Sequence, residues 1–590
     1  MFDFRVLPEL LLEAATRHPG EHALNYPSSN GGWITYSSGD FKKRVSDLAL
    51  GLRKLGIRKG ETVGLIAPPS PEWLALDLAI QTAGGVTVPI FKRISPESFT
   101  HEVKDSGMRY LFVGNPEEIP MAQEIGARHA RIITFAYEGT HPDFEKLLAE
   151  GDALGKKDPD LFTELCHSPL PDDLATIIYT SGSTGLPKGV KLSQRNLVSQ
   201  IVASAGSFPN DAASDRCLSV LPLAHIFERM VVYFYIASGL PVYFADSPKN
   251  LADFVNRVHP TTMTVVPRIL EKIHLRMREN TEEQSGLKRV LAGKAIARAE
   301  ARDPDSRRKT ALDLLFDALV YGKMRGALGG SFTTVICGSA KLDPEIVRFF
   351  INIGVPVYEG YGLTEASPVI AANTPESHKV GTVGMPFPGV EVKISEEGEI
   401  LARSEGVMHG YLNRPDASKE VIDAEGWLHT GDLGSLDEDG FLRITGRKKD
   451  IFKKSTGEYV PPVPIERALE EFPVIDTAII FADNRTYVTA LLFPDMERLS
   501  RYKKSQGFKS MSDGTFLSSD WLREKIQEHV TEVNRHRHHC EHVERFEILD
   551  HEATVESGEL TPTLKIRRHQ IEEMYHDVIE GMYESIGGWK

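Results

Sequence analysis

Cysteine is scarce in this chain of 590 residues: the only four are Cys166, Cys217, Cys337 and Cys540, and they are far apart in the sequence. No two of them stand in a C-x-x-C spacing, so the sequence indicates neither a metal knuckle nor a disulfide framework. Scattered single cysteines are typical of reduced thiols, and we therefore expect a cytoplasmic protein.

Long hydrophobic runs are also missing. The most apolar window, Met230–Ala245, is broken by Gly239 and Pro241 and is shorter than the roughly 20 residues that a membrane-spanning helix needs. We expect it to form a buried helix followed by a strand. The N-terminal segment carries Asp3 and Glu9 and has no basic region followed by an apolar run, so we expect no signal peptide.

Positive charge is in deficit, with 68 Lys and Arg against 83 Asp and Glu and a net charge of −15. This balance argues against a general nucleic-acid-binding protein and gives no broad attraction to anionic lipid. A local basic cluster between Arg447 and Lys454 is an exception. Peripheral contact with the inner face of a membrane and the oligomeric state both stay open at this point.

What the sequence does contain is an alternation of helical and strand patterns. Helical periodicity over Phe41–Leu55 and Pro71–Ala83 alternates with apolar strand patterns over Thr62–Ala67 and Val86–Ile90. Such alternation predicts an α/β fold with parallel sheets flanked by helices. The length of the chain indicates two to four domains or subdomains of roughly 100–200 residues each.

Two later regions depart from this alternation. Residues 276–328 are rich in charged residues and alanine with periodic leucine, which predicts a helical excursion of two or three helices. A hairpin is predicted over 426–445 around the turn sequence Asp437–Gly440. After a boundary near Arg447 we expect a small α+β segment, with helices over 465–472, 519–534 and 567–574 and strands over 477–482, 487–493 and 546–549.

The most informative stretch is Tyr179–Val190, whose core, Ser181–Lys188, holds hydroxyl residues, glycines and one lysine directly after an apolar strand pattern. Glycines let several backbone N–H groups point at one spot, and such a nest binds anions. The stretch is not a Walker A loop, because Lys188 is followed by Gly189 and another extended piece, with the next helix expected only from Gln194. Taken alone, the stretch is compatible with a phosphate-binding loop and with a solvated linker.

Three further segments follow in the order and spacing of a known family. They are Tyr358–Glu365 (YEGYGLTE), Trp427–Gly434 (WLHTGDLG) running on to Ile444–Asp450 (ITGRKKD), and Leu560–Arg568 (LTPTLKIRR). Together with Tyr179–Val190 they resemble the adenylate-forming enzyme superfamily, which includes acyl-CoA synthetases, firefly luciferase and the adenylation domains of peptide synthetases. The resemblance spans nearly the whole chain, and the helical excursion resembles that of the long-chain acyl-CoA synthetases.

The resemblance implies a large N-terminal domain of helix-flanked sheets, residues 1–446, that binds ATP and the acyl group. A hinge at 447–450 and a small mobile α+β C-terminal lid domain, residues 451–590, follow. In the implied reaction a long-chain fatty carboxylate attacks the α-phosphate of magnesium ATP and releases pyrophosphate. The lid then turns, and coenzyme A takes the acyl group from the adenylate and releases AMP.

The resemblance also assigns the nucleotide site. The residues implied to hold the phosphates are Thr180, Ser181, Gly182, Ser183, Thr184, Gly185 and Lys188. The two walls of the adenine pocket are implied to be a tight loop of Gly360, Tyr361 and Gly362, and the segment Gly338, Ser339 and Ala340. Thr364 is expected to reach the α-phosphate, and Glu365 together with Thr184 is expected to hold Mg²⁺, which prefers oxygen ligands.

Further roles come from single positions. The resemblance implies that Asp432, assisted by Arg447, binds the ribose hydroxyls of the nucleotide. It also implies that Lys449 is the hinge residue. Lys453 matches a lysine that enters the site after the lid turns, and His225 matches a residue at the mouth of the acyl or coenzyme A path. For Lys449, Lys453 and His225 the alternative is a solvated surface residue.

Lys565 matches the catalytic lysine of the family. The reaction brings a carboxylate to a triphosphate, and two like unit charges ~4 Å apart repel by ~1 kcal/mol in water and ~4 kcal/mol at an effective dielectric of ~20. A lysine between the two anions turns this repulsion into attraction and orients the attack. A solvated loop lysine is the alternative that the residue alone would suggest.

A histidine-rich run near the C-terminus suggests a metal site at first sight: His536, His538, His539, Cys540 and His542. Its spacing matches no tidy ligand set, since only His538 and His542 would share a helix face, and we expect a polar helix end instead.

Two other functions stay open. An acyl-AMP ligase that passes the acyl group to a carrier protein would share every ATP-binding residue. A non-catalytic lipid- or nucleotide-binding module would be expected to lack Lys188, Glu365, Asp432 or Lys565, and all four are present. The acyl chain length cannot be read from the sequence, because it depends on residues far apart along the chain.

Overall fold

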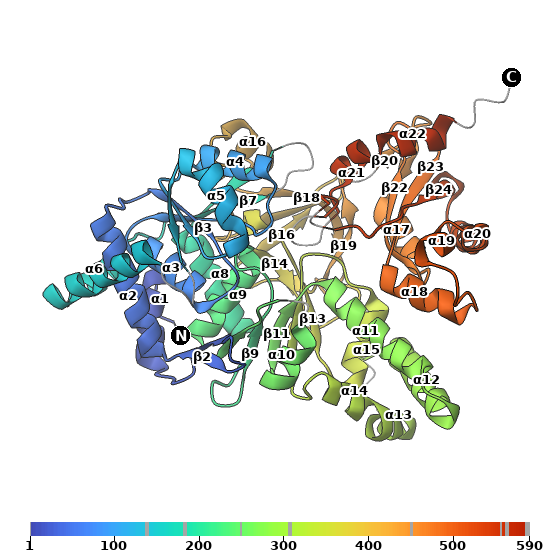
Figure 1. The fold of residues 1–590 in the computed structure, drawn as a ribbon, viewed down its shortest axis with the longest axis horizontal. Coiled ribbons are helices and arrows are strands. Elements are labelled where there is room, and N and C mark those ends of the chain that lie inside the picture. Colours follow the sequence, from blue (N-terminus) through green and yellow to red (C-terminus); the bar gives the residue numbers. More distant parts are fainter. Residues whose placement is uncertain are drawn as a thin grey trace. The chain divides into compact units, whose positions relative to one another are not determined.

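The computed structural model describes residues 2–135, 141–180, 186–247, 250–304, 310–448, 452–554, 557–560 and 566–584 (Figure 1). The chain divides into two compact units, and each is described by itself. The larger unit comprises Met1–Thr430 and Gly434–Ile444, and the smaller unit comprises Gly431–Leu433 and Thr445–Lys590.

The larger unit contains a six-stranded sheet in the order β6-β5-β3-β4-β7-β8. All neighbouring strands are parallel except β7 and β8, which pair antiparallel. Its strands are β3 (Thr62–Ile66), β4 (Val86–Pro89), β5 (Tyr110–Val113), β6 (Arg131–Thr134), β7 (Leu174–Thr180) and β8 (Lys188–Ser193). The strands β4 and β5 are buried along their whole length, as parallel strands covered on both faces require.

A second sheet of the larger unit has nine strands in the order β15-β14-β13-β12-β11-β9-β10-β1-β2. The run from β13 to β1 is parallel, and β2, β14 and β15 are antiparallel additions at the edges. Its strands are β1 (Leu24–Pro27), β2 (Trp33–Tyr36), β9 (Cys217–Ser219), β10 (Val242–Phe244), β11 (Thr262–Val265), β12 (Thr334–Cys337), β13 (Val357–Gly362), β14 (Val369–Ala372) and β15 (Met385–Pro386). The predicted α/β class with parallel sheets is confirmed.

Helices pack against these sheets, with α3 on β3 and β4, α9 on β9 and β10, and α15 on β13 (Figure 1). The helices of the larger unit outside the excursion are α1 (Leu7–Arg17), α2 (Ser38–Leu55), α3 (Pro71–Thr82), α4 (Pro96–Ser106), α5 (Ile119–Glu124), α6 (Pro142–Lys157), α7 (Leu161–His167), α8 (Gln194–Ser207), α9 (Ile226–Ala237), α10 (Leu251–Val258), α15 (Pro344–Ile353) and α16 (Pro415–Val421). The predicted helices at 41–55 and 71–83 are α2 and α3, and the predicted buried helix and strand over 230–245 are the end of α9 and β10.

Local signals fix the ends of these helices. Ser37 caps α2, where its hydroxyl accepts the backbone N–H of Asp40 at 3.0 Å, and the Asp40 carboxylate accepts the backbone N–H of Ser37 in return. The helix stops at Gly56, whose φ of 98° is favourable only for glycine. Helix α3 begins with Pro71 directly after a capping serine, a position at which the missing N–H of proline costs nothing.

The region predicted as a helical excursion is helical in the structure, with two differences from the prediction. Its described residues form α11 (Pro267–Glu282), α12 (Gly286–Ala301), α13 (Ala311–Phe316) and α14 (Gly322–Ala327), with a π-helical turn, Asp317–Tyr321, between the last two. These are four helices instead of two or three. The excursion also starts at Pro267 rather than at residue 276, because proline fits the first helical turn.

Two strands have residues in both units, with Gly431–Leu433 of the first and the residues from Thr445 of the second in the smaller unit. They belong to a four-stranded sheet with the order β16-β17-β18-β19. Its strands are β16 (Glu391–Ile394), β17 (Glu399–Arg403), β18 (Leu428–Leu436) and β19 (Leu442–Arg447). The strands β18 and β19 form the predicted hairpin, and the backbone N–H of Gly440 donates to the carbonyl of Asp437 at 3.0 Å in its turn.

The smaller unit is α+β, as predicted. Its three-stranded sheet is β22 (Ile475–Phe481), β23 (Val488–Pro494) and β24 (Val543–Ile548), and a short ribbon pairs β20 (Phe452–Lys453) with β21 (Tyr459–Val460). Its helices are α17 (Pro462–Glu470), α18 (Met496–Ser505), α19 (Asp513–Leu517), α20 (Asp520–Arg535), α21 (Arg568–Met574) and α22 (His576–Glu584). Helix α20 ends at Arg535, directly before the histidine-rich run.

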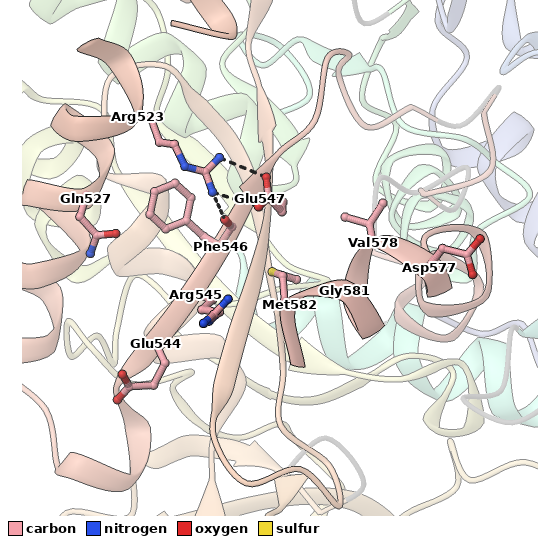
Figure 2. Close-up of a pocket in the computed structure, with 10 residues that line it drawn as sticks. All are labelled: Arg523, Gln527, Glu544, Arg545, Phe546, Glu547, Asp577, Val578, Gly581 and Met582. Carbon is pink, nitrogen blue, oxygen red and sulfur yellow. Dashed lines mark hydrogen bonds and ion pairs between the residues drawn. The ribbon is translucent and has the colours of Figure 1, made fainter. Parts of the chain in front are cut away.

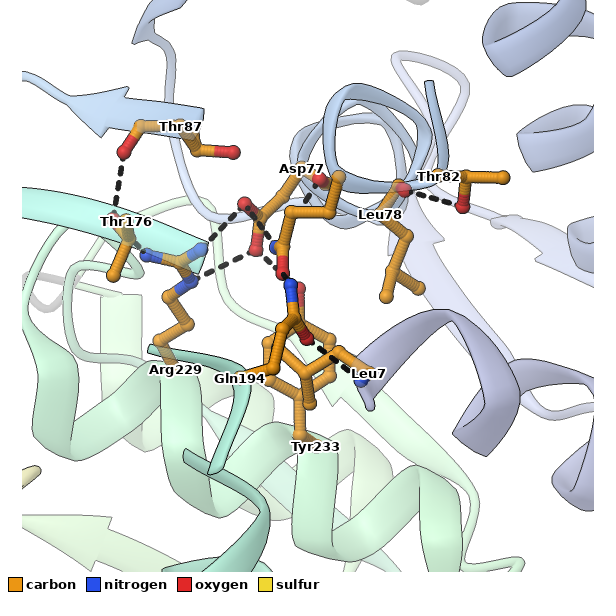
Figure 3. A network of polar contacts seen from close by, with 10 residues as sticks. Leu7, Asp77, Leu78, Thr82, Thr87, Thr176, Gln194, Arg229 and Tyr233 are labelled. Atoms are coloured by element: carbon orange, nitrogen blue, oxygen red, sulfur yellow. Dashed lines mark hydrogen bonds and ion pairs between the residues drawn. The ribbon is translucent and has the colours of Figure 1, made fainter. Parts of the chain in front are cut away.

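A buried polar network ties the core of the larger unit together (Figure 3). The Arg229 guanidinium of α9 binds the Asp77 carboxylate of α3 through two N–H groups, at 2.5 and 2.8 Å, and donates to the Thr176 hydroxyl of β7 at 2.8 Å. The Tyr233 phenol donates to the same carboxylate. Arg229 and Asp77 are fully buried, so each charge depends on the other for compensation.

None of the helices within the described ranges combines the length and the apolar character that crossing a membrane requires.

Candidate functional site

The predicted phosphate loop lies between two paired strands. Strand β7 ends at Thr180 and β8 begins at Lys188, and these two residues are register partners in the antiparallel pair. The predicted strand-loop-strand arrangement, which differs from a Walker A loop, is confirmed. Ser181, Gly182, Ser183, Thr184 and Gly185 themselves lie outside the described residues.

Helix α4 fixes both ends of this loop. The Tyr179 phenol donates a hydrogen bond to the Asp105 carboxylate at 2.9 Å, and Nε2 of His101 lies 2.9 Å from the carbonyl oxygen of Pro187. Burial and the Asp105 carboxylate both raise the pKa of Tyr179, so its phenol remains a donor at neutral pH. No pattern in the sequence indicates that α4 contributes to the site.

Lys188 and Glu365 are joined by a third residue, Tyr411. The Nζ atom of Lys188 lies 5.1 Å from the centre of the Tyr411 ring, within the range of a cation–π contact. The Tyr411 phenol donates to Oε1 of Glu365 at 2.9 Å. Burial and the neighbouring carboxylate raise the pKa of Tyr411, which keeps the phenol protonated. The predicted phosphate lysine and the predicted magnesium carboxylate are therefore parts of one cluster.

Backbone hydrogen bonds hold the segment that carries Tyr411. The N–H of Leu412 donates to the carbonyl of Gly189 at 2.7 Å, next to Lys188, and the N–H of Met408 donates to the carbonyl of Glu365 at 2.9 Å. The segment thus attaches both to β8 and to the 3-10 helix Thr364–Ala366, in which Thr364 is buried. The position of the phenol is fixed by the backbone on either side of it.

The two predicted walls of the adenine pocket lie against each other. A Cβ atom at Gly338 would lie 3.5 Å from the carbonyl oxygen of Gly360 and 3.3 Å from the Phe227 ring. Gly338 directly follows β12, and the next residue, Ser339, has a φ of 74°. A side chain at 338 would therefore meet an ordinary van der Waals contact with the neighbouring strand and a slightly tight one with the Phe227 ring.

The predicted tight loop at Gly360–Gly362 is wrong, because these residues form the end of β13. Gly360 and Tyr361 pair with Ala372 and Ala371 of β14, and the register shifts after Tyr361. The partner strand comes from later in the chain, and its pairing extends β13 through the two glycines. At Gly362 a Cβ atom would lie 1.8 Å from the carbonyl oxygen of Pro368, so only glycine permits this approach.

His225 lies at the start of α9. It is the N-cap of that helix, and its Nδ1 accepts the backbone N–H of Phe227 at 3.2 Å. Its ring meets Phe91 with the ring centres 6.5 Å apart. The ring of Phe227 lies close to Gly338, so this residue connects His225 with the predicted wall.

The predicted ribose pair belongs to the smaller unit. Nε of Arg447 donates to Oδ1 of Asp432 at 2.8 Å. The Asp432 side chain is 6% exposed and that of Arg447 is 59% exposed, so the carboxylate is held in place while the guanidinium extends to the surface. In the same unit the backbone N–H of Lys453 donates to Asp483 at 3.1 Å, and its Nζ lies 5.9 Å from the ring centre of Tyr459.

A cavity in the smaller unit contains none of the predicted residues (Figure 2). It has a volume of about 410 Å³ and is bordered by α20, β24 and α22. Arg523 on its wall is already bound to the Glu547 carboxylate at 2.9 Å. The residues that line it are Arg523, Gln527, Glu544, Arg545, Phe546, Glu547, Asp577, Val578, Gly581 and Met582.

The predicted residues thus fall into three groups. The larger unit brings Lys188 together with Glu365 and, separately, Gly338 with Gly360. The smaller unit pairs Asp432 with Arg447. The hinge and catalytic positions, Lys449 and Lys565, lie outside the described residues, as does Thr184. Tyr411 was missed, because a single tyrosine after a glycine has no distinguishing pattern and its partner, Glu365, is far away in sequence.

The cluster in the larger unit suits an anionic, metal-bound ligand. Lys188 supplies positive charge, and the Glu365 carboxylate supplies the hard oxygen ligand that Mg²⁺ prefers. Since Tyr411 donates to one carboxylate oxygen of Glu365, it restricts the orientation of that ligand, as an outer-shell partner does in metal sites generally. The donor set therefore fits a magnesium-bound phosphate group.

Models of known protein families match almost the entire sequence. A model of the AMP-binding enzyme family matches residues 11–412, and a model of the AMP-binding enzyme C-terminal domain matches residues 449–587. The chain is 34% identical to the long-chain-fatty-acid–CoA ligase FadD15 of Mycobacterium bovis, over 94% of this chain and 93% of that protein. It is 29% identical to the long-chain-fatty-acid–CoA ligase ACSBG1 of Rattus norvegicus, over 98% of this chain and 85% of that protein.

Solved structures show the same fold. ATP-bound MatB from Rhodopseudomonas palustris superposes with a TM-score of 0.72 at 20% identity, covering 97% of this chain and 99% of that one. The adenylation domain of a carboxylate reductase from Mycobacterium chelonae superposes with a TM-score of 0.75 at 21% identity, covering 98% of this chain and 91% of that one.

Proposed function

Because the chain belongs to the family of AMP-binding enzymes, we propose that it activates a long-chain fatty acid with ATP and transfers the acyl group to coenzyme A. In the first step a carboxylate oxygen bonds to the α-phosphorus, and the bond to pyrophosphate breaks. In the second step the coenzyme A sulfur bonds to the acyl carbon, AMP leaves, and the thiol proton is lost. The products are acyl-CoA, AMP and pyrophosphate.

The observation that carries this proposal is the cluster of Lys188, Tyr411 and Glu365 beside the β7–β8 loop. It combines a cation for phosphate with an oriented carboxylate. The long-chain substrate and the coenzyme A acceptor rest on the relatives, which are named long-chain-fatty-acid–CoA ligases and match over almost their whole length. The helical excursion α11–α14 is the second support for the long-chain type.

Each residue has a role in the proposed mechanism. Lys188, Thr180 and the loop Ser181–Gly185 hold the phosphates, and Thr364 reaches the α-phosphate. Glu365 and Thr184 hold magnesium, which when bound neutralises phosphate charge. The remaining contacts to the nucleotide are assigned to Gly338, Ser339, Ala340, Gly360, Tyr361, Gly362, Asp432 and Arg447. His225 borders the acyl or coenzyme A path.

Lys565 is proposed to stand between the fatty carboxylate and the α-phosphate. There it lowers the repulsion between two anions and aligns the attack. A rotation of the C-terminal domain about Lys449 then withdraws Lys565 and brings Lys453 to the site. The division of the chain into two compact units, with the break in contacts at Ile444 and Thr445, supports a hinge at 447–450.

We also propose a cytoplasmic enzyme that meets the inner face of a membrane peripherally. Isolated, widely spaced cysteines suit a reducing compartment. Long-chain fatty acids partition into bilayers, so an enzyme that consumes them gains access to substrate at the membrane surface.

The test is pyrophosphate release from ATP across a panel of carboxylic acids, with and without coenzyme A, combined with detection of acyl-CoA by mass spectrometry. We expect continuous turnover with long-chain acids only when coenzyme A is present. Lys565→Ala should abolish adenylate formation, whereas Lys509→Ala, which alters an exposed lysine of the same unit, should leave it unchanged.

Two results would change the assignment. Pyrophosphate formed once per enzyme, with no effect of coenzyme A, would identify an acyl-AMP ligase that needs a carrier protein. If none of the acids leads to pyrophosphate release, the proposal that this protein is an acid-activating enzyme is wrong.

A further inference from the structure

An exposed apolar helix face lies on the excursion, away from the residues discussed so far. The chain from Ala311 to Ala327 is continuously helical through α13, the π-helical turn and α14. Four leucines on it are exposed to solvent, and Leu314 has the largest exposed fraction, 59%. We define the leucine face by the three that are spaced three and four residues apart: Leu312, Leu315 and Leu319.

The leucine face differs from the side of the helix that packs against the rest of the protein. Phe316, Val320 and Tyr321 form the buried side, and the Tyr321 phenol donates to the carbonyl of Ala295 in α12 at 2.8 Å. Leu312, Leu315 and Leu319 are spaced three and four residues apart, so they line a second, outward stripe. A helix that is apolar on both sides is normally covered on both sides.

The same part of the molecule concentrates exposed apolar side chains. Among the described residues, fifteen large hydrophobic side chains are exposed, and six of them lie between Leu287 and Leu319. The other two of the six, Leu287 and Val290, are 87% and 54% exposed on α12. Single exposed apolar residues are normal in soluble proteins, but a concentration of this kind marks a surface that meets another apolar phase or partner.

The charges around the leucine face are basic, although the whole chain carries −15. On α12, α13 and α14 themselves the exposed charged side chains are Lys288, Arg289, Lys294 and Lys323, and exposed acidic residues flank α12 at Glu282, Glu283 and Asp303. The acidic residues of the same elements are engaged in ion pairs: Glu300 with His274, Asp313 with Arg298, and Asp317 with Arg325. The surface therefore offers leucines and cations to its surroundings.

We propose that the leucine face, together with the exposed basic residues of the neighbouring helix α12, docks the enzyme on a membrane that contains anionic phospholipid. Leucines insert at the boundary between headgroups and acyl chains, and cations are attracted to the negative surface potential. A second copy of this chain fits less well, because a twofold contact would bring the same cations face to face. Helix α12 contacts the π-helical turn between α13 and α14, and Figure 1 shows the three helices in the same part of the larger unit.

The direct test is flotation of the full chain with vesicles, in the absence of ATP, coenzyme A and fatty acid. The vesicles consist of phosphatidylcholine alone or of phosphatidylcholine with phosphatidylglycerol. We expect the wild type to float mainly with the phosphatidylglycerol vesicles. The double variant Leu315→Ser/Leu319→Ser should bind them about tenfold more weakly, since two inserting side chains are lost.

Matched variants separate this surface from general effects. Leu170→Ser/Val202→Ser changes two exposed apolar residues elsewhere in the larger unit and should float like the wild type. Lys288→Glu/Arg289→Glu should lose the preference for phosphatidylglycerol. Lys504→Glu/Lys509→Glu, which makes the same change in net charge on exposed residues of the smaller unit, should keep that preference.

Defined outcomes would overturn the proposal. One is absence of vesicle binding by the wild type, and another is equal binding by the wild type and the Leu315→Ser/Leu319→Ser variant. A wild-type dimer in sedimentation velocity that this variant converts to a monomer would instead assign the leucine face to a subunit contact. Because flotation needs no turnover, it can fail while the proposed synthetase activity stands, and the activity can fail while flotation succeeds.

Discussion

The phenol of Tyr411 donates a hydrogen bond to the carboxylate of Glu365 at 2.9 Å. This bond connects a segment beside β8 with the residue proposed to hold magnesium. It restricts the carboxylate before any ligand arrives, and a preorganised carboxylate needs no reorientation when the metal-bound nucleotide binds.

Tyr411→Phe should therefore weaken the binding of magnesium ATP while leaving the fold intact. A hydrogen bond to a charged group contributes about 1.5–3 kcal/mol, so we expect roughly a tenfold to hundredfold higher magnesium concentration for half-maximal rate. The rise in Tm produced by ATP with magnesium should shrink, while the rise produced by ATP without magnesium should not. Tyr243→Phe, a change in β10, serves as the control. Equal magnesium dependence in the wild type and Tyr411→Phe would show that the bond is structural only.

Asp432→Asn should reduce the affinity for ATP by about tenfold or more, because the amide cannot accept hydrogen bonds from Arg447 and from two hydroxyls as a carboxylate can. Since Arg447 is largely exposed, the loss of the ion pair should change the Tm little. Isothermal titration with ATP measures the affinity. Unchanged affinity for ATP would remove Asp432 from the proposed ribose site.

Asp105→Asn should raise the KM for ATP by a few-fold, because Tyr179 loses the carboxylate that fixes one end of the phosphate loop. The change in kcat should be smaller than the change in KM if the loop mainly binds the phosphates. Lys104→Ala, at the neighbouring exposed position of α4, is the matched control. A larger loss in kcat than in KM would place the loop in the chemical step instead.

Glu102→Gln should stabilise the protein at alkaline pH. Burial raises the pKa of the Glu102 carboxyl to about 8 from an ordinary value of 4.5, so the folded state favours the protonated acid. The contribution of this protonated carboxyl to the free energy of unfolding is fully present below pH 4.5. It is lost as the pH rises towards about 8, by up to about 1.4 kcal/mol per pH unit.

The measurement is the Tm of the wild type and of Glu102→Gln between pH 5 and pH 9. The difference in favour of the variant should grow with pH. The exposed neighbour Glu97→Gln should give a constant difference. A pH-independent difference for Glu102→Gln as well would show that this carboxyl is not buried in its neutral form.

Asp77→Asn should lower the stability of the larger unit by about 3–5 kcal/mol, because it leaves the Arg229 charge buried without its counter-ion. Calorimetry would register this as a clear drop in Tm of the transition that belongs to the larger unit. Asp416→Asn on the exposed first turn of α16 should have little effect. A Tm within one degree or so of the wild type would mean that water or a neighbouring group replaces the lost carboxylate.

Much of the fold follows from local patterns in the sequence. The helical periods over 41–55 and 71–83 and the apolar strands near 62 and 86 appear as α2, α3, β3 and β4. Capping serines and first-turn prolines explain why the predicted helix boundaries lie close to those in the structure. The α+β order of the smaller unit was predicted in the same way, although the unit also contains α18, α19 and α22.

The errors share a physical cause, which is pairing with distant segments. Gly360–Gly362 looked like a loop because two glycines favour turns, but β14 returns to pair with it and extends the strand. Tyr411 and Asp105 have no local signal, since their partners, Glu365 and Tyr179, are far away in sequence. The Asp432–Arg447 pair was predictable only through the resemblance to a known family.

Asp432 and Arg447 have a practical consequence for dividing this protein into fragments. A fragment that stops at Ile444, where the larger unit ends, would retain the carboxylate and discard its guanidinium partner. The backbone N–H of Lys448 also donates to the carbonyl of Gly431 at 2.8 Å. An N-terminal fragment intended to bind nucleotide should therefore extend through Lys448, because Asp432 precedes Ile444 in the sequence but belongs with Arg447 to the smaller unit.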